Sequence, residues 1–443
     1  MKKIISLIIV CTIIISGMFI YGKSDKKDLL EDNNGPIIAA VIDGKASTTF
    51  PTTNKYTATV ECTRNGIKQD VGAKATWNGT KWVVSFNDIS AGNVRCNATF
   101  ITKVPTFAET ILANNKVKAP ITTPGATIST ASEALLASTE DDYGTSYYFR
   151  GAVTNNYVEF ANKCWRIVRI TGDGSIKLVL HNDNTSKATN PCSATNNSTT
   201  AAFAHYNGNT YTSKFNEKND DNAYIGFMYG TASSSDYVST HANTNKSTIL
   251  TNLETWYKNN LVSYEDKFSD TIWCNDKSTF TTYTSGSTYG TGLGYGTKQT
   301  GYGAFNRIYG GDATSYASPS LICPNDNNGG KLSKFTVDDT KNGNGNLTYK
   351  IGLLTADEIA FAGSIAYTYN RSTYLQENTG TTWWWSLSPG GFNGGGALVW
   401  GVGFGELSAY SIRHSAGLRP AISLISSTSV TGNGTSDNPY IIN

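Results

Sequence analysis

The sequence has few charged residues and few histidines, and each shortage excludes a class of protein. Only 16% of the 443 residues are charged, and 36 Lys and Arg oppose 34 Asp and Glu, so the formal net charge is +2. A nucleic-acid-binding protein needs a basic excess or a basic stripe to neutralise phosphates, and we find neither. The four histidines are scattered, and no C-x-x-C pair accompanies them. We therefore expect no nucleic-acid partner, no metal and no cofactor.

Aromatic residues and glycine, by contrast, are abundant. The aromatic share is 12%, with 25 Tyr, 17 Phe and 9 Trp, and 43 Gly stand against 11 Pro. Enough aromatic side chains are present to build a large core. Glycine together with much Ser, Thr and Asn is typical of a loop-rich chain with many β-strands. At roughly 150 residues per domain, the length predicts two or three folded units.

The N-terminus predicts export from the cytoplasm. Lys2 and Lys3 precede an apolar run from Ile4 to Tyr21, and about 18 residues in a helix are just enough to cross a bilayer. We interpret residues 1–22 as a transmembrane anchor or signal segment. The preferred interpretation is a single-pass membrane protein with the bulk of the chain extracellular. A cleaved signal peptide and a lipid anchor on Cys11 are the alternatives.

Six further cysteines predict disulfides, because an even number in an exported chain is typical of an oxidising compartment. Sequence order favours pairing neighbours within each apparent subdomain, although six cysteines allow 15 pairings. The expected bridges are Cys62–Cys96, Cys164–Cys192 and Cys274–Cys323.

Changes in composition divide the rest of the chain. Cysteines that bracket Trp77 and Trp82, with the hairpin signal Asn78-Gly79 between them, predict a small immunoglobulin-like β-sandwich. A Pro-, Ser- and Thr-rich stretch after it is typical of a linker. The expected parts are a tether at 23–36, the sandwich at 37–104, a linker with a short helix at 105–140, and a ligand-binding head at 141–443.

Two helices are predicted within the head. Ser247 is a plausible N-cap before a buried stripe that repeats every 3.6 residues. Thr355 and Glu358 form a capping box at the start of the second helix, and Gly363 suits its end.

The most informative segment runs from Trp383 to Leu424. WWxLSP at Trp384–Pro389, a Gly- and Asn-rich stretch followed by A-x-V-W, and Gly417-Leu418-Arg419-Pro420-Ala421 resemble exported bacterial C-type-lectin-like domains. Several such domains are variable ligand-binding proteins that retroelements diversify. The resemblance implies an α+β head with mixed short strands and two or more helices, behind the all-β immunoglobulin-like domain and the transmembrane helix.

The resemblance also implies where a ligand binds. A rigid scaffold would expose the loops and strands of residues 390–416, which would recognise an extracellular protein or glycan without a covalent step. Aromatic rings, Arg and Asn are suited to recognition. The predicted ligand-binding residues are Phe392, Asn393, Trp400, Phe404, Tyr410, Arg413 and His414.

Two other functions are left as alternatives. One is an extracytoplasmic enzyme on a fold like that of formylglycine-generating enzymes, which use a reactive Cys pair; Cys274 and Cys323 lack the surrounding motif of that family. The other is a passive cell-surface structural protein. We expect no catalytic residues, because His414 has no evident nucleophile and supporting acid beside it.

Overall fold

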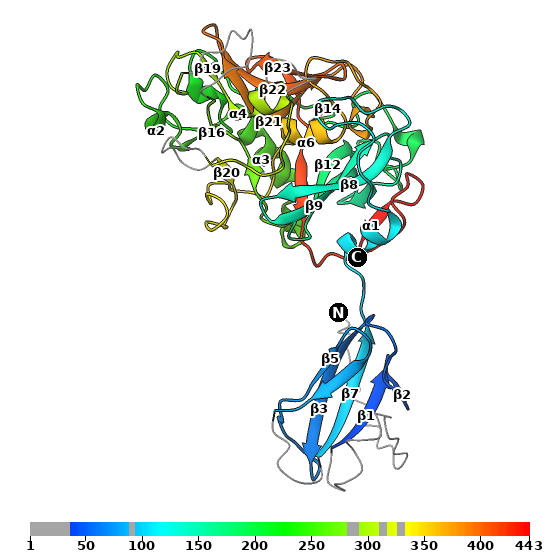
Figure 1. Ribbon diagram of the computed structural model, residues 1–443. Helices are drawn as coiled ribbons and strands as arrows, with labels where there is room; N and C mark the ends of the chain where they lie inside the picture. The colour runs from blue at the N-terminus through cyan, green and yellow to red at the C-terminus, as the bar shows by residue number, and fades with distance from the viewer. Residues whose placement is uncertain (1–35, 88–93, 281–291, 310–316, 326–332) are drawn as a thin grey trace, which may run out of the picture. The chain divides into compact units, whose positions relative to one another are not determined.

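The structure is a computed structural model that describes residues 36–87, 94–280, 292–309, 317–325 and 333–443. The chain divides into two compact units, Met1–Val104 and Pro105–Asn443 (Figure 1). Strands account for 34% and helices for 14% of the chain, so it is mostly sheet. The predicted α+β class with a C-type-lectin-like head is therefore wrong. Among the described residues the longest helix has 13 residues, so the helices there are too short to form a layer of their own.

The first unit is built on a five-stranded sheet in the order β2-β1-β7-β3-β4, with a separate β5–β6 hairpin. Trp82 on the hairpin packs edge-on against Phe100 of β7, with ring centroids 5.3 Å apart. The strands are β1 (Ile37–Ile42), β2 (Lys45–Ser47), β3 (Tyr56–Arg64), β4 (Ile67–Lys68), β5 (Lys74–Trp77), β6 (Trp82–Ser85) and β7 (Val94–Thr102).

The disulfide of this unit differs from that of an immunoglobulin domain. Cys62 and Cys96 are directly opposite each other on the neighbouring antiparallel strands β3 and β7. An immunoglobulin disulfide instead joins the two sheets of the sandwich. The bridge therefore ties two strands of one sheet, and it does not support the immunoglobulin interpretation.

The second unit begins with residues that we expected to form a linker with a short helix. Helix α1 (Phe107–Asn114) buries Phe107 and Ile111 completely in the main core. A capping box between Thr106 and Glu109 fixes its start. Residues 105–140 therefore belong to the second unit and are not a separate linker.

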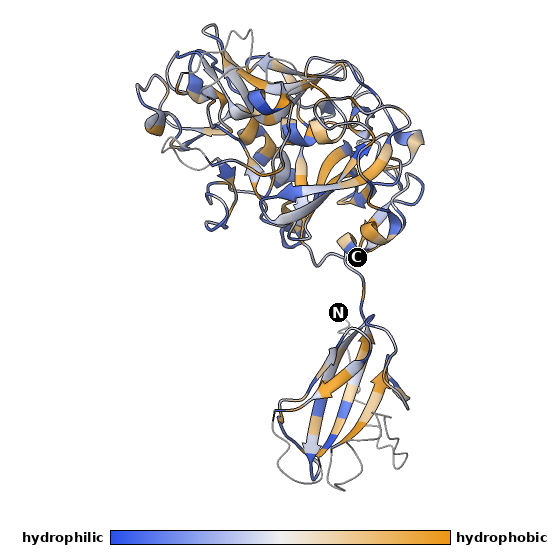
Figure 2. Ribbon diagram, viewed as in Figure 1, coloured by the Kyte–Doolittle hydropathy of each residue, from blue (hydrophilic) through white to orange (hydrophobic). Residues whose placement is uncertain are grey.

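The main sheet of this unit has eight strands in the order β25-β12-β11-β10-β27-β26, with β9 on β11 and β8 on β9. Every residue of β11 and β12 is buried, so the sheet is covered on both faces. In Figure 2 its strands carry hydrophobic and hydrophilic residues side by side, and buried Lys and Arg are among the hydrophilic ones. The strands are β8 (Ala134–Asp141), β9 (Gly144–Gly151), β10 (Tyr157–Phe160), β11 (Lys163–Ile170), β12 (Ile176–Asn182), β25 (Ala421–Leu424), β26 (Val430–Thr431) and β27 (Tyr440–Ile442).

A second sheet, in the order β15-β24-β21-β22-β23 with β19 on β21, carries the segment singled out in the sequence. Its antiparallel strands β22 and β23 lie at the opposite end of the unit from α1 (Figure 1). The strands are β15 (Thr212–Ser213), β19 (Thr300–Gly301), β21 (Trp384–Phe392), β22 (Ala397–Gly403), β23 (Glu406–Ser411) and β24 (Ala416–Gly417).

Both helices predicted in the head are confirmed. Ser247 caps α3 by accepting a hydrogen bond from the Leu250 amide at 3.3 Å, and Thr355 and Glu358 form the expected capping box of α6. The helices and two-residue strand pairs of the unit are α2 (Tyr237–Thr240), α3 (Thr248–Asn260), α4 (Gly303–Ile308), α6 (Ala356–Phe361), β13 (His205–Tyr206) with β14 (Asn209–Thr210), β16 (Met228–Tyr229) with β17 (Asn245–Lys246), and β18 (Trp273–Cys274) with β20 (Lys334–Phe335).

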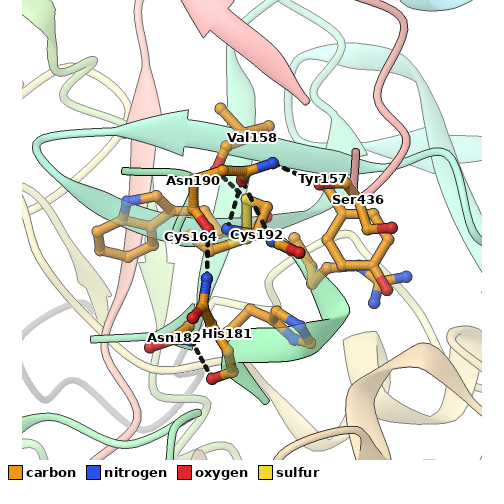
Figure 3. Close-up of a disulfide and its surroundings, with 12 residues drawn as sticks. Tyr157, Val158, Cys164, His181, Asn182, Asn190, Cys192 and Ser436 are labelled. Carbon is orange, nitrogen blue, oxygen red and sulfur yellow. Dashed lines mark hydrogen bonds between the residues drawn. A yellow bond between two sulfur atoms is a disulfide. The ribbon is translucent and has the colours of Figure 1, made fainter. Parts of the chain in front are cut away.

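The three predicted disulfides are confirmed. Figure 3 shows Cys164–Cys192, which joins β11 to the polar segment that follows β12. Asn190 supports this junction, because its Oδ1 accepts from the Cys192 amide at 2.9 Å and its Nδ2 donates to the Ser436 carbonyl at 3.0 Å. The bridge therefore anchors a long polar segment to the main sheet.

The predicted single-pass membrane localisation must be corrected. Among the described residues, no helix is long and apolar enough to cross a membrane. The anchor or signal segment at 1–22 and nearly all of the tether at 23–36 lie outside the described residues.

Candidate functional site

The turn between β22 and β23 presents a phenylalanine in an unfavourable backbone conformation. Gly403 pairs with Glu406, which leaves Phe404 and Gly405 as a two-residue turn. Their φ angles are 54° and 85°, and two positive values are typical of a type I′ turn. For a bulky residue the left-handed region costs roughly 1–2 kcal/mol. The side chain of Phe404 is nevertheless 50% exposed, so burial of its ring does not explain the residue type.

Other two-residue turns of the same chain use residues that suit this conformation. In the part of the chain that the structure describes, the two-residue turns with two positive φ angles are Asp43-Gly44, Asn65-Gly66, Ala161-Asn162, Asn207-Gly208 and Phe404-Gly405. Three of them begin with Asp or Asn, which tolerate the left-handed region well. Phe404 is the bulky exception, and backbone strain of this kind is a reason to look for function.

Three predicted binding residues surround a fourth ring, that of Trp383, which was not among the predicted binding residues. The Trp383 ring lies 4.2 Å from Tyr410, 5.8 Å from His414 and 6.2 Å from Phe404, measured between centroids. His414 is nearly parallel to the indole, with an interplanar angle of 23°. We call these four residues the Trp383 patch. Trp383 and Tyr410 are partly buried, whereas Phe404 and His414 are exposed.

Two glycines of β22 make room for the rings. A Cβ atom at Gly403 would lie 2.8 Å from the Tyr410 hydroxyl and 2.9 Å from Cδ1 and Nε1 of Trp383. One at Gly401 would lie 3.3 Å from the Tyr410 ring. The rings of Tyr410 and Trp383 therefore pack directly against the backbone of β22 at these glycines. Burial raises the pKa of the Tyr410 phenol above its usual 10.0, so the hydroxyl is neutral at physiological pH and can donate a hydrogen bond.

Arg413 and Asn393 are exposed, but only Arg413 is close to the patch along the chain. Arg413 directly precedes His414. Asn393 follows the far end of β21, whereas Trp383 precedes its start. The strand between them spans roughly 30 Å. The structure therefore does not bring Asn393 together with the patch.

Two predicted binding residues are core side chains, and the prediction is wrong for both. Phe392 is 1% exposed and lies in the last position of β21, paired with Ala397. Trp400 is fully buried, and its ring packs 5.6 Å from Phe305 and 5.7 Å from Tyr367. Trp400 projects from the face of β22 opposite to that of Gly401, because neighbouring residues of a strand face opposite sides.

A small cavity beside the Cys274–Cys323 disulfide is the main alternative site. It is lined largely by charged side chains, and the space open to the centre of a water molecule is about 20 Å³. That volume holds about one water molecule, and it is too small for an organic substrate. Within the described residues, no group of three or more His, Cys, Asp or Glu side chains is placed to hold a metal ion.

The charges around this cavity are paired with one another. Arg307 binds Asp357 at 2.9 Å and Asp276 at 2.7 Å, and Glu358 binds Arg169 at 2.9 Å and Lys177 at 2.7 Å. Burial alone would raise the pKa of Glu358, but the two cations outweigh it and lower the pKa to about 2. Glu358 is therefore a permanently charged member of a structural ion-pair network, and nothing in its setting favours proton transfer at neutral pH.

Comparisons with known proteins give no relative of this chain. None of the family models matches it, and no curated protein and no solved structure matches it either. The resemblance of residues 384–421 to exported binding domains therefore stays a prediction.

Proposed function

We propose that the chain is a ligand-binding protein that recognises its ligand non-covalently through the Trp383 patch. The observation that carries the proposal is the exposed Phe404 ring at a turn position that disfavours it. Phe404 adds backbone strain to the folded chain, and burial of its ring offsets little of that strain. A contact between the ring and a ligand would explain why a phenylalanine stands at this position.

The composition of the patch supports this function. Aromatic side chains offer a large contact area with few rotatable bonds, so they lose little conformational entropy on binding. Rings held against one another on a rigid sheet are pre-organised, which lowers the entropic cost of association further. The three disulfides support a place of action in an oxidising compartment.

The charged cavity supports binding over catalysis. Its carboxylates are engaged by Arg and Lys side chains, and its volume of about 20 Å³ admits no substrate. An enzyme is expected to offer a larger pocket with titratable groups poised near the working pH.

The test compares two variants in selections with short random peptides displayed on phage and with an array of glycans. Phe404→Asn removes the ring and supplies a residue suited to the turn, so the fold keeps its stability while binding falls at least about tenfold. Tyr206→Asn is the matched control, because Tyr206 is equally exposed at 50% and also adjoins a two-residue turn. Unchanged binding by the Phe404→Asn protein contradicts the proposal.

A further inference from the structure

A short segment outside the predicted binding region lies along the free edge of β23. The Tyr367 amide donates to the Leu407 carbonyl at 2.9 Å, and the Asn370 amide donates to the Gly405 carbonyl at 3.0 Å. The Asn370 side chain is buried, and its amide group donates to backbone carbonyls of the scaffold at 2.9 and 3.2 Å. Residues 366–371 are therefore fixed beside the Phe404 turn.

Within this segment Tyr369 extends the face that carries the patch. Tyr369 forms an antiparallel bridge with Glu406, and residues paired in this way project to the same face. Glu406 and Tyr410 share a face of β23, because they are four residues apart along the strand. Tyr369 is 62% exposed, so a large accessible ring stands on the Tyr410 side of the sheet, beyond Glu406.

Two arginines adjoin residues of this extended face in the chain, because Arg413 precedes His414 and Arg371 follows Tyr369 by two residues. Arg413 is exposed, and its guanidinium makes no hydrogen bond or ion pair with any residue of the described chain. Arg371 lies against Gly405, because a Cβ atom at Gly405 would be 2.8 Å from the Arg371 Cγ. The Arg371 guanidinium donates to the Gly380 carbonyl at 2.6 Å. Glu406, a carboxylate of this face, offsets one of the two arginine charges, so one positive charge remains. The local charge therefore favours an anionic partner.

We propose that the ligand is an acidic protein segment that lies across this face from His414 to Tyr369. This inference rests on the proposed function and adds Tyr369, Arg371 and Arg413 as residues that determine specificity. Apolar side chains of the segment would contact the patch and Tyr369, while its carboxylates would pair with the two guanidiniums, which bind carboxylates in a two-pronged geometry. A neutral glycan would leave both arginines without a charged partner.

The experiment uses two pools of synthetic peptides that differ only in charge. In one pool Asp and Glu alternate with Trp, Phe and Leu; in the other, Asn and Gln replace the acids. The whole chain binds the acidic pool about tenfold more tightly at low salt, and the difference shrinks in about 0.5 M NaCl because salt screens the pairing. Arg413→Glu removes the difference, and Tyr369→Ser weakens binding severalfold. Lys118→Glu, which changes the net charge equally at another exposed site, has no effect.

The outcomes separate this inference from the proposed function. The inference is overturned if the wild type binds the two pools equally, binds neutral maltohexaose more tightly, or does not bind the acidic pool. It is also overturned if the Arg413→Glu protein still prefers the acidic pool. If Phe404→Asn still abolishes binding of the neutral pool or of maltohexaose, the Trp383 patch remains the binding site and only the acidic partner is wrong. Acidic binding that survives Phe404→Asn instead contradicts the proposed function.

Discussion

A methyl group at Gly403 would collide with both rings of the Trp383 patch, at 2.8 Å from the Tyr410 hydroxyl and 2.9 Å from the Trp383 indole. Neither ring can move inward, because the backbone of β22 lies beneath them. We therefore expect Gly403→Ala to displace the rings, to lower the free energy of unfolding by about 1–3 kcal/mol and to weaken binding.

The near-ultraviolet circular dichroism spectrum, urea unfolding and peptide binding measure these three effects. Gly395→Ala is the control, since a Cβ there meets only the Asn393 side chain at 3.4 Å, an ordinary contact. A Gly403→Ala protein with wild-type spectrum and binding would show that the rings do not rest on β22.

Three of the seven binding residues predicted from the sequence lie in the Trp383 patch. For Phe404 the reason is the turn between β22 and β23. Gly-Phe-Gly predicts a tight turn with an exposed Phe404, which the structure has. Phe392 and Trp400 could not be assigned, because a shift of one residue in strand register exchanges the two faces. Trp383 was missed because the consecutive tryptophans look alike in sequence, although only Trp384 and Trp385 are buried.

At the scale of elements, local signals predicted the helices and failed for the sheets. The N-cap at Ser247 and the capping box at Thr355 are encoded within four residues, so α3 and α6 follow from the sequence. Pairing of β12 with β25 joins residues more than 200 positions apart, and the sequence of neither strand indicates which strand it pairs with. The same reason explains why the sequence predicted the Cys62–Cys96 pair but did not show that both cysteines lie in one sheet.

The α+β expectation failed for a related physical reason. That expectation came from the resemblance of residues 384–421 to C-type-lectin-like domains. The two predicted helices are present, but most other described elements of the second unit are short strands whose pairing is non-local. The short helix expected within residues 105–140 is present as α1, and Phe107 and Ile111 bury it in the core of the second unit. The composition of the segment does not show that the helix packs there, because its Pro, Ser and Thr are typical of a linker.

At the scale of the whole molecule, buried titratable groups predict how stability depends on pH. Burial, together with Arg166 and Arg419, lowers the pKa of His181 well below 6.5, and burial with Lys277 does the same for His241. The unfolded chain takes up these protons near pH 6.5 and the folded chain does not, so stability falls as the pH drops below that value.

Glu358 adds a second loss at lower pH. Its pKa is about 2 in the folded chain against 4.5 for an ordinary Glu, so the stability it provides is present above pH 4.5 and is lost between 4.5 and 2. Urea unfolding measured from about pH 8 to about pH 3 checks both steps. His181→Gln reduces the upper step and Glu358→Gln reduces the lower one, to which other carboxyl groups with lowered pKa values such as Asp339 also contribute. Constant stability between about pH 7 and pH 5 would contradict the assignment of the histidines.

Fluorine NMR of the chain labelled with 5-fluorotryptophan, titrated with the peptides selected for binding, tests whether the ligand contacts the Trp383 patch. The signal that disappears in Trp383→Phe identifies the indole of the patch. On addition of peptide, that signal shifts or broadens, while those of the buried Trp384 and Trp400 move little. Binding that leaves the Trp383 signal unchanged would place the recognition surface elsewhere and contradict the account.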